Sequence, residues 1–142
     1  MITTAPERGH ATRAHTADEI LEAWGPTREA CLEEAVLALV DTFAAVGDIG
    51  WSWHHEAELS GSDPELLVAL LQEVIYHLDA DGAVPVRVHV RPHAGGMVLH
   101  LWLTDLHRVT PVGAPPKGVS YSQLSIHQEG TGRWRCRAII DV

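Results

Sequence analysis

The spacing of apolar residues changes along this chain, and that change does most to limit its fold. In two segments between residues 27 and 78, apolar side chains recur every three or four positions, which is the period of a helix with one buried face. From residue 83 onward they alternate with polar side chains, which is the period of a half-buried strand. Helical runs followed by strand runs are typical of an α+β domain. We therefore predict two helices packed on one face of a mostly antiparallel β-sheet.

The helical segments have recognisable beginnings. The first is expected over residues 27–45, with Thr27 as its N-terminal cap. The second is expected over residues 63–78, with Asp63 as its cap. Residues 46–62 lie between them and are predicted to form a short strand and then a loop.

The alternating segments are predicted to form hairpins. Residues 86–104 reverse direction at a Pro- and Gly-containing turn, and this symmetry pairs Val88 with Leu101 and His89 with His100. All aliphatic side chains of this hairpin would then share one face.

The rest of the chain fits a sheet less directly. A second hairpin is expected to close the chain, turning at residues 129–132. Residues 105–118 are rich in Pro and Gly and form a loop long enough to suggest a functional role. Residues 9–25 show poor alternation and predict at most two short strands, interrupted at residues 15–18.

Length and composition limit the organisation further. The chain has 142 residues, so we expect a flexible tail over residues 1–8 and a single domain over residues 9–142. It has no apolar run long enough to span a membrane and no hydrophobic signal segment. Its two cysteines form no CxxC pair. We therefore expect a cytoplasmic protein with no membrane partner.

Charge is distributed unevenly. Residues 1–82 carry sixteen acidic and three basic side chains, whereas residues 83–142 carry three acidic and seven basic ones. The formal net charge of −9 argues against a protein that coats nucleic acid unaided, so no stable direct nucleic-acid binding is expected. The basic half could meet an anionic partner, or it could simply be a sheet with arginines on its outer face.

Ten histidines raise the question of a metal centre or a hydrolase. Their spacings include no HxH or HExxH pair, and the adjacent His54 and His55 would point to opposite faces of a strand. The cysteines, Cys31 and Cys136, occupy apolar positions and are expected in the core. A small metal-dependent hydrolase that uses histidine and aspartate side chains remains an alternative.

Carboxylates at the ends of predicted strands offer another kind of site. Asp18 begins one strand, and Asp141 with Val142 ends the last one. Oxygen ligands gathered from these positions would suit a hard cation such as Ca²⁺ or Mg²⁺. From these residues alone, an ordinary capping aspartate and a solvated chain end are the simpler explanation. Lys117, the only lysine, lies just before a predicted strand.

Four motifs in order resemble the archease family. The first is HTAD at residues 15–18, together with the short strand and the helix that follow it. The second is the leucine-rich helix from residue 63. The other two are KGVSY at residues 117–121 and the closing AIIDV at residues 138–142. The resemblance covers about residues 9–142. It implies an archease-like α+β fold and an accessory protein rather than an enzyme. Such a protein promotes guanylylation and turnover of an RtcB-type, GTP-dependent RNA ligase in tRNA splicing and RNA repair.

The resemblance also implies a set of site residues. It assigns a divalent cation to Asp18, Asp141 and Val142, with Ca²⁺ expected first and Mg²⁺ or Mn²⁺ as alternatives. It assigns activation of the partner ligase to Lys117.

Residues next to these ligands are also part of the predicted site. His15 and Tyr121 are expected to support the ligands. Two positions depart from the family pattern: residues 19–21 read EIL where the family usually has an Ile-Gly pair, and Ser122 stands where it often has histidine. A diverged binding domain without a metal is therefore a further alternative.

Overall fold

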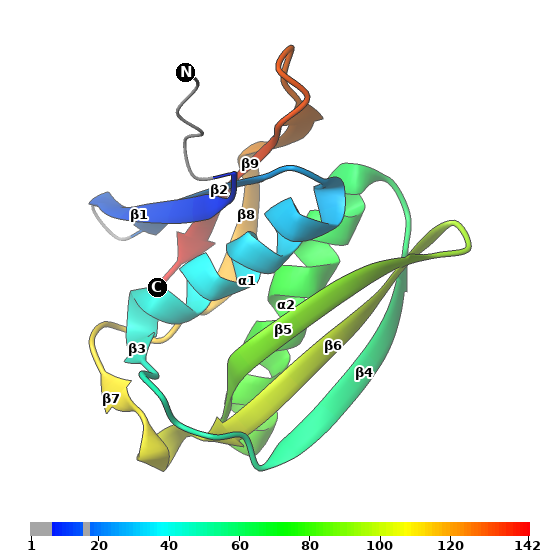
Figure 1. Cartoon of the computed structure of the whole chain (residues 1–142). Coiled ribbons are helices and arrows are strands. Elements are labelled where there is room, and N and C mark those ends of the chain that lie inside the picture. Colours follow the sequence, from blue (N-terminus) through cyan, green and yellow to red (C-terminus); the bar gives the residue numbers. More distant parts are fainter. Residues whose placement is uncertain (1–6, 16–17) are drawn as a thin grey trace, which may run out of the picture.

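Helices and antiparallel strands together build the protein. The computed structural model describes residues 7–15 and 18–142 (Figure 1). Within them, two α-helices combine with strands whose pairings are all antiparallel, which confirms the predicted α+β class. Residues 1–6 of the predicted tail and residues 16–17 of the HTAD motif lie outside the described residues.

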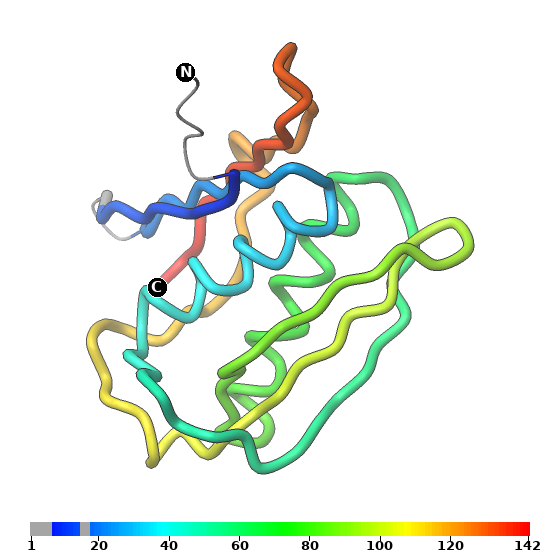
Figure 2. The backbone as a smooth tube through the Cα atoms, viewed as in Figure 1, coloured from blue at the N-terminus to red at the C-terminus, as the bar shows by residue number. Residues whose placement is uncertain are grey.

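One sheet joins the two ends of the chain. Its strands are ordered β1-β2-β9-β8. They are β1 (Gly9–His15), β2 (Asp18–Gly25), β9 (Trp134–Asp141) and β8 (Gly118–Gln128). The weakly predicted N-terminal strands are thus real, and Figure 2 shows this blue hairpin beside the red C-terminal strand.

The second sheet contains the first predicted hairpin. Its strands are ordered β4-β6-β5. They are β4 (Trp53–Ser60), β6 (Gly96–Asp105) and β5 (Ala83–His93). The predicted pairing of Val88 with Leu101 and of His89 with His100 is confirmed. The prediction of a short strand and then a loop over residues 46–62 is wrong. Strand β4 continues to Ser60, because it pairs with β6 along its whole length.

The first helix, α1, spans Arg28–Phe43 and begins at the predicted cap, where the Thr27 hydroxyl accepts a hydrogen bond from the Ala30 N–H. It ends two residues before the predicted position because β3 (Ala44–Ala45) leaves the helix to pair with β7 (Thr110–Pro111). The predicted loop over residues 105–118 therefore contains β7 and a short 3₁₀ helix, Leu106–Arg108.

The second helix, α2, spans Asp63–Asp81, three residues beyond the predicted end. Its cap is Ser62 and not Asp63. The Ser62 hydroxyl accepts from the Glu65 N–H at 3.3 Å, and the Glu65 carboxylate accepts from the Ser62 N–H at 2.9 Å. This reciprocal pair satisfies two amides at the helix start, which is why the helix begins where it does.

Both helices contact both larger sheets. Most of the α1 surface is consequently buried, as expected for a helix covered on more than one side. Apolar residues that recur at helical spacing in the two helices, among them Leu32, Leu39, Leu70 and Val74, are fully buried. Neither described helix has the length and apolar character needed to cross a membrane.

A polar network ties β1 to α1. The two ring nitrogens of His10 contact Glu34 at 2.8 Å and Asp41 at 2.7 Å, and Arg8 donates to Glu34 at 2.6 Å. Burial disfavours protonation of His10, but the hydrogen bonds to Glu34 and Asp41 outweigh it and raise the His10 pKa above its usual value. The network is therefore strongest when this imidazole carries a proton.

Candidate functional site

Strand pairing brings the two predicted carboxylate ligands together. Asp18 and Asp141 are directly opposed in the antiparallel ladder between β2 and β9. Opposed residues place their Cβ atoms on one face of the sheet, about 4.5–5.5 Å apart. Both carboxylates therefore leave the same face at the same end of the sheet.

The remaining predicted residues lie at this end as well. Val142 follows Asp141 directly and packs half-buried against the core. The Lys117 backbone N–H donates to the Asp141 carbonyl at 2.7 Å, while the Lys117 side chain is exposed. Gly118 is opposed to Asp141 from β8. The tertiary structure thus gathers Asp18, Asp141, Val142 and Lys117, whereas their part in binding a cation stays a prediction.

His15 and Tyr121, the two residues expected to support the ligands, are described by the structure to different extents. The backbone of His15 pairs with Asp18, but the His15 side chain lies outside the described residues. Tyr121 is 70% exposed and begins a bulge in β8, where the register slips between Ser120 and Ser125. Within the described residues, no side-chain hydrogen bond joins Tyr121 to either aspartate. Sequence alternation gave no sign of this bulge.

The bulge opens a groove beside Asp18. The groove has a volume of about 590 Å³, and its polar lining residues include Arg13, Ser120, Ser122, Gln123 and Arg137. Arg137 donates to the Gln123 side-chain carbonyl at 3.0 Å, and its buried Nε makes no hydrogen bond within the described residues. Guanidinium groups and hydroxyls of this kind can bind a carboxylate or phosphate group.

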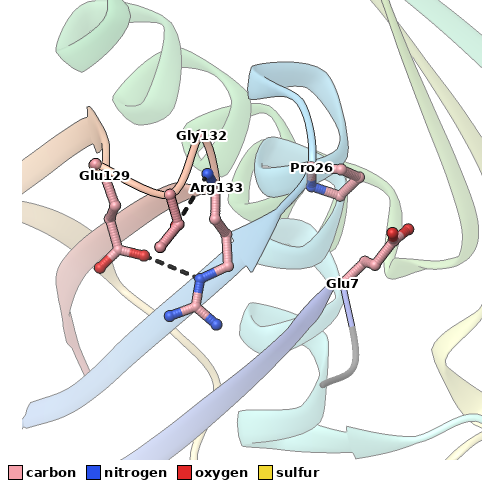
Figure 3. Close-up of a pocket in the computed structure, with 7 residues that line it drawn as sticks. Glu7, Pro26, Glu129, Gly132 and Arg133 are labelled. Atoms are coloured by element: carbon pink, nitrogen blue, oxygen red, sulfur yellow. Dashed lines mark hydrogen bonds and ion pairs between the residues drawn. The ribbon is translucent and has the colours of Figure 1, made fainter. Parts of the chain in front are cut away.

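A second pocket lies beside the turn between β8 and β9 and contains none of the predicted site residues (Figure 3). Its charged pair is Glu129 with Arg133, whose Nε donates to the carboxylate at 2.9 Å. This hydrogen bond lowers the Glu129 pKa. The pair joins the two ends of the turn, so its charges are already used in holding the hairpin.

The two thiols belong to the core, as predicted. Cys31 and Cys136 are both fully buried and free. The Cys136 pKa is raised well above the usual value for a thiol. The larger cause is a hydrogen bond with Cys31, and the second is burial of the thiol. Both thiols are enclosed by the core and out of reach of a substrate, so neither cysteine is a candidate catalytic group.

One cluster of possible ligands carries no recognisable sequence motif. His55, Glu73 and His77 each offer a ligand atom, and all three atoms lie within 4.8 Å of one another. Glu73 and His77 are four residues apart on α2, a spacing that puts both side chains on one face of a helix. That spacing was readable in the sequence, whereas the contribution of His55 from β4 was not.

Comparisons with known proteins agree with this fold. The Archease protein family (MTH1598/TM1083) matches residues 10–142. The "Probable protein archease" of Mycobacterium tuberculosis (strain CDC 1551 / Oshkosh) is 40% identical over 135 residues, which cover 94% of this chain and 75% of the relative. "Protein archease" of Pyrococcus furiosus is 28% identical over 135 residues, covering 90% of this chain and 94% of the relative.

Two solved structures share the architecture. Protein 1598 of Methanobacterium thermoautotrophicum has a TM-score of 0.74 at 20% identity, covering 94% of this chain and 99% of the other. An archease from Thermotoga maritima, described as a possible chaperone, has a TM-score of 0.66 at 16% identity, covering 100% and 99%. These likenesses concern the fold, while the family match extends over nearly the whole sequence. The chain therefore belongs to the archease family.

Proposed function

We propose that this protein is a non-catalytic accessory factor of an RtcB-type, GTP-dependent RNA ligase in tRNA splicing and RNA repair. It binds a divalent cation and promotes guanylylation and repeated turnover of the ligase. The observation that carries the proposal is the register of β2 and β9, in which Asp18 opposes Asp141. Membership of the archease family supports the same assignment.

The cation would be held by oxygen atoms. The carboxylates of Asp18 and Asp141 supply two ligands, and Val142 supplies a third through its carbonyl or carboxylate. Ligands of this type favour Ca²⁺, with Mg²⁺ or Mn²⁺ as alternatives. A bound ion would offset the repulsion between the two opposed carboxylates and stabilise the ends of β2 and β9 against each other.

Lys117 would connect the cation to the ligase. Its amide is bonded to the Asp141 carbonyl, so an ion that orders Asp141 also restrains the backbone that carries the lysine side chain. The exposed ammonium group is free to contact a ligase surface. The neighbouring groove, with Arg13 and Arg137, could receive an acidic side chain of that partner.

A ligation time course tests the activity. The purified ligase joins an RNA with a 2′,3′-cyclic phosphate end to a 5′-hydroxyl end with GTP, with and without this protein. We expect faster guanylylation and multiple turnovers with the wild-type chain, and loss of most of this gain with Asp18→Asn or Lys117→Ala. Asp48→Asn, an exposed aspartate of the loop after β3, is the matched control and should activate normally. Equal ligation with and without the wild-type protein would overturn the proposal.

Calorimetry tests the cation separately. Wild-type protein is titrated with Ca²⁺, Mg²⁺ and Mn²⁺, and Asp18→Asn and Asp141→Asn should each abolish the binding heat. A wild type that binds none of the three ions would instead support the diverged, metal-free binding domain. Hydrolytic turnover by the isolated protein would support the alternative of a small metal-dependent hydrolase.

A further inference from the structure

We propose that His55, Glu73 and His77 bind a divalent transition-metal ion, with Zn²⁺ as the best fit, and that this ion joins β4 to α2. The site is separate from the carboxylates at the end of the first sheet and uses a different ligand chemistry. It depends on three side chains from two elements that the fold brings together.

Strand alternation directs His55 toward α2. Its neighbour His54 points to the opposite face, where its Nε2 lies 2.9 Å from Nδ1 of His100. On the inner side, the ring of His55 meets that of His77 edge-on, with centroids 4.2 Å apart. Glu73 lies one helical turn before His77 and therefore on the same face of α2.

The distances between ligand atoms suit one ion. Nε2 of His55 is 2.9 Å from Oε1 of Glu73, and Nε2 of His77 is 3.4 Å from the same oxygen. Ligands about 2.0–2.1 Å from a tetrahedral Zn²⁺ lie roughly 3.3 Å from one another. The two nitrogen–oxygen distances lie on either side of this value, and the two histidine nitrogens lie within 4.8 Å of each other, so an ion could draw the three ligand atoms into one coordination shell.

His77 supplies the independent indication of a ligand. Its side chain is only 7% exposed, and its Nε2 is buried without a hydrogen bond within the described residues. Its other nitrogen, Nδ1, lies 3.2 Å from the Asp81 carboxylate. With the proton on Nδ1, Nε2 directs a lone pair toward Glu73 and His55. A carboxylate that orients a histidine in this way is a common feature of metal sites, and an ion would satisfy the buried nitrogen.

The ligand set selects the class of metal. Two imidazole nitrogens and one carboxylate suit Zn²⁺ and its neighbours, whereas Ca²⁺ and Mg²⁺ prefer oxygen ligands. Water would complete a tetrahedral shell, and the 35% exposure of the His55 side chain provides access from solvent. Because β4 is an edge strand of its sheet, an ion at this position would fasten that edge to the helix.

The test uses the full-length protein stripped of metal with a chelator. Zn²⁺ is titrated against a chromophoric competitor, and Co²⁺ is added separately to record the visible bands of a tetrahedral complex. We expect one equivalent to bind, with affinity lowered about 100-fold or more by His55→Gln or His77→Gln, and about 10–100-fold by Asp81→Asn. The matched control, His54→Gln, should leave affinity and spectrum unchanged.

The other outcomes are equally informative. Asp18→Asn should bind Zn²⁺ as the wild type does, so failure of this site and failure of the carboxylate site are distinguishable. A thermal melt in chelator verifies that each variant folds, and His55→Gln, on the edge strand, tests the site even if His77→Gln does not fold. Absence of stoichiometric Zn²⁺ binding would overturn the proposal. So would loss of binding in His54→Gln with retention in His55→Gln.

Discussion

Replacement of Asp18 by asparagine should have opposite effects on stability with and without a cation. Asp18 and Asp141 oppose each other across two strands, so both carboxylates face one side of the sheet. Without an ion, removal of one charge relieves repulsion. With an ion, the same change removes a ligand. An aspartate with a purely structural role would not reverse its effect in this way.

The expected magnitudes follow from this geometry. Like charges directly opposite in a sheet destabilise by about 0.2–1 kcal/mol, so in chelator Asp18→Asn should raise the free energy of unfolding by that amount. For a domain of this size each kcal/mol moves the Tm by roughly 2–4 °C. A cation present at about 100 times its Kd stabilises the wild type by about 2.7 kcal/mol. The variant should gain nothing from it, so the order of the two Tm values should reverse.

Thermal melts followed by circular dichroism measure this reversal. Wild type, Asp18→Asn and the control Asp48→Asn are melted at low ionic strength in excess chelator and then in excess Ca²⁺. The control should follow the wild type in both conditions. A calcium-induced rise of the same size in Asp18→Asn, or a wild type already more stable than the variant in chelator, would refute the reasoning.

Three further changes test the fold. Leu101→Ala, at a fully buried position of β6, should lower the free energy of unfolding in urea by about 2–5 kcal/mol, whereas Val112→Ala, in an exposed loop, should have little effect. Ser62→Ala should cost about 0.5–2 kcal/mol in the same assay, because it removes the cap of α2; no loss would show that the cap is not needed. His10→Asn should destabilise more at about pH 5.5 than at about pH 9. The His10 pKa is higher in the folded than in the unfolded chain, so protonated His10 stabilises the fold fully at a pH below the unfolded-state pKa. This stabilisation is lost as the pH rises through the folded-state pKa. An equal loss of stability in the variant at both pH values would contradict the network.

Much of the local structure could be predicted because it depends on near neighbours. The register that pairs His89 with His100 follows from alternation on either side of one tight turn. The cap of α2 was misplaced because Ser62 and Asp63 are both good caps, although the glutamate three residues after Ser62 identifies the correct one. The full length of β4 was missed because its partner, β6, lies on the far side of α2 in the sequence.

Periodicity along the chain was enough to specify two amphipathic helices, a hairpin register and a core, since each requires only residues a few positions apart. It could not pair Asp18 with Asp141, which come from opposite ends of the chain. Nor could it bring His55 to Glu73 and His77, or form the bulge that opens the groove beside Asp18. Such contacts form only when distant segments bury a common core, and that burial must outweigh the entropy of closing long loops. The candidate sites therefore arise from tertiary packing, while the elements that carry them arise from local pattern.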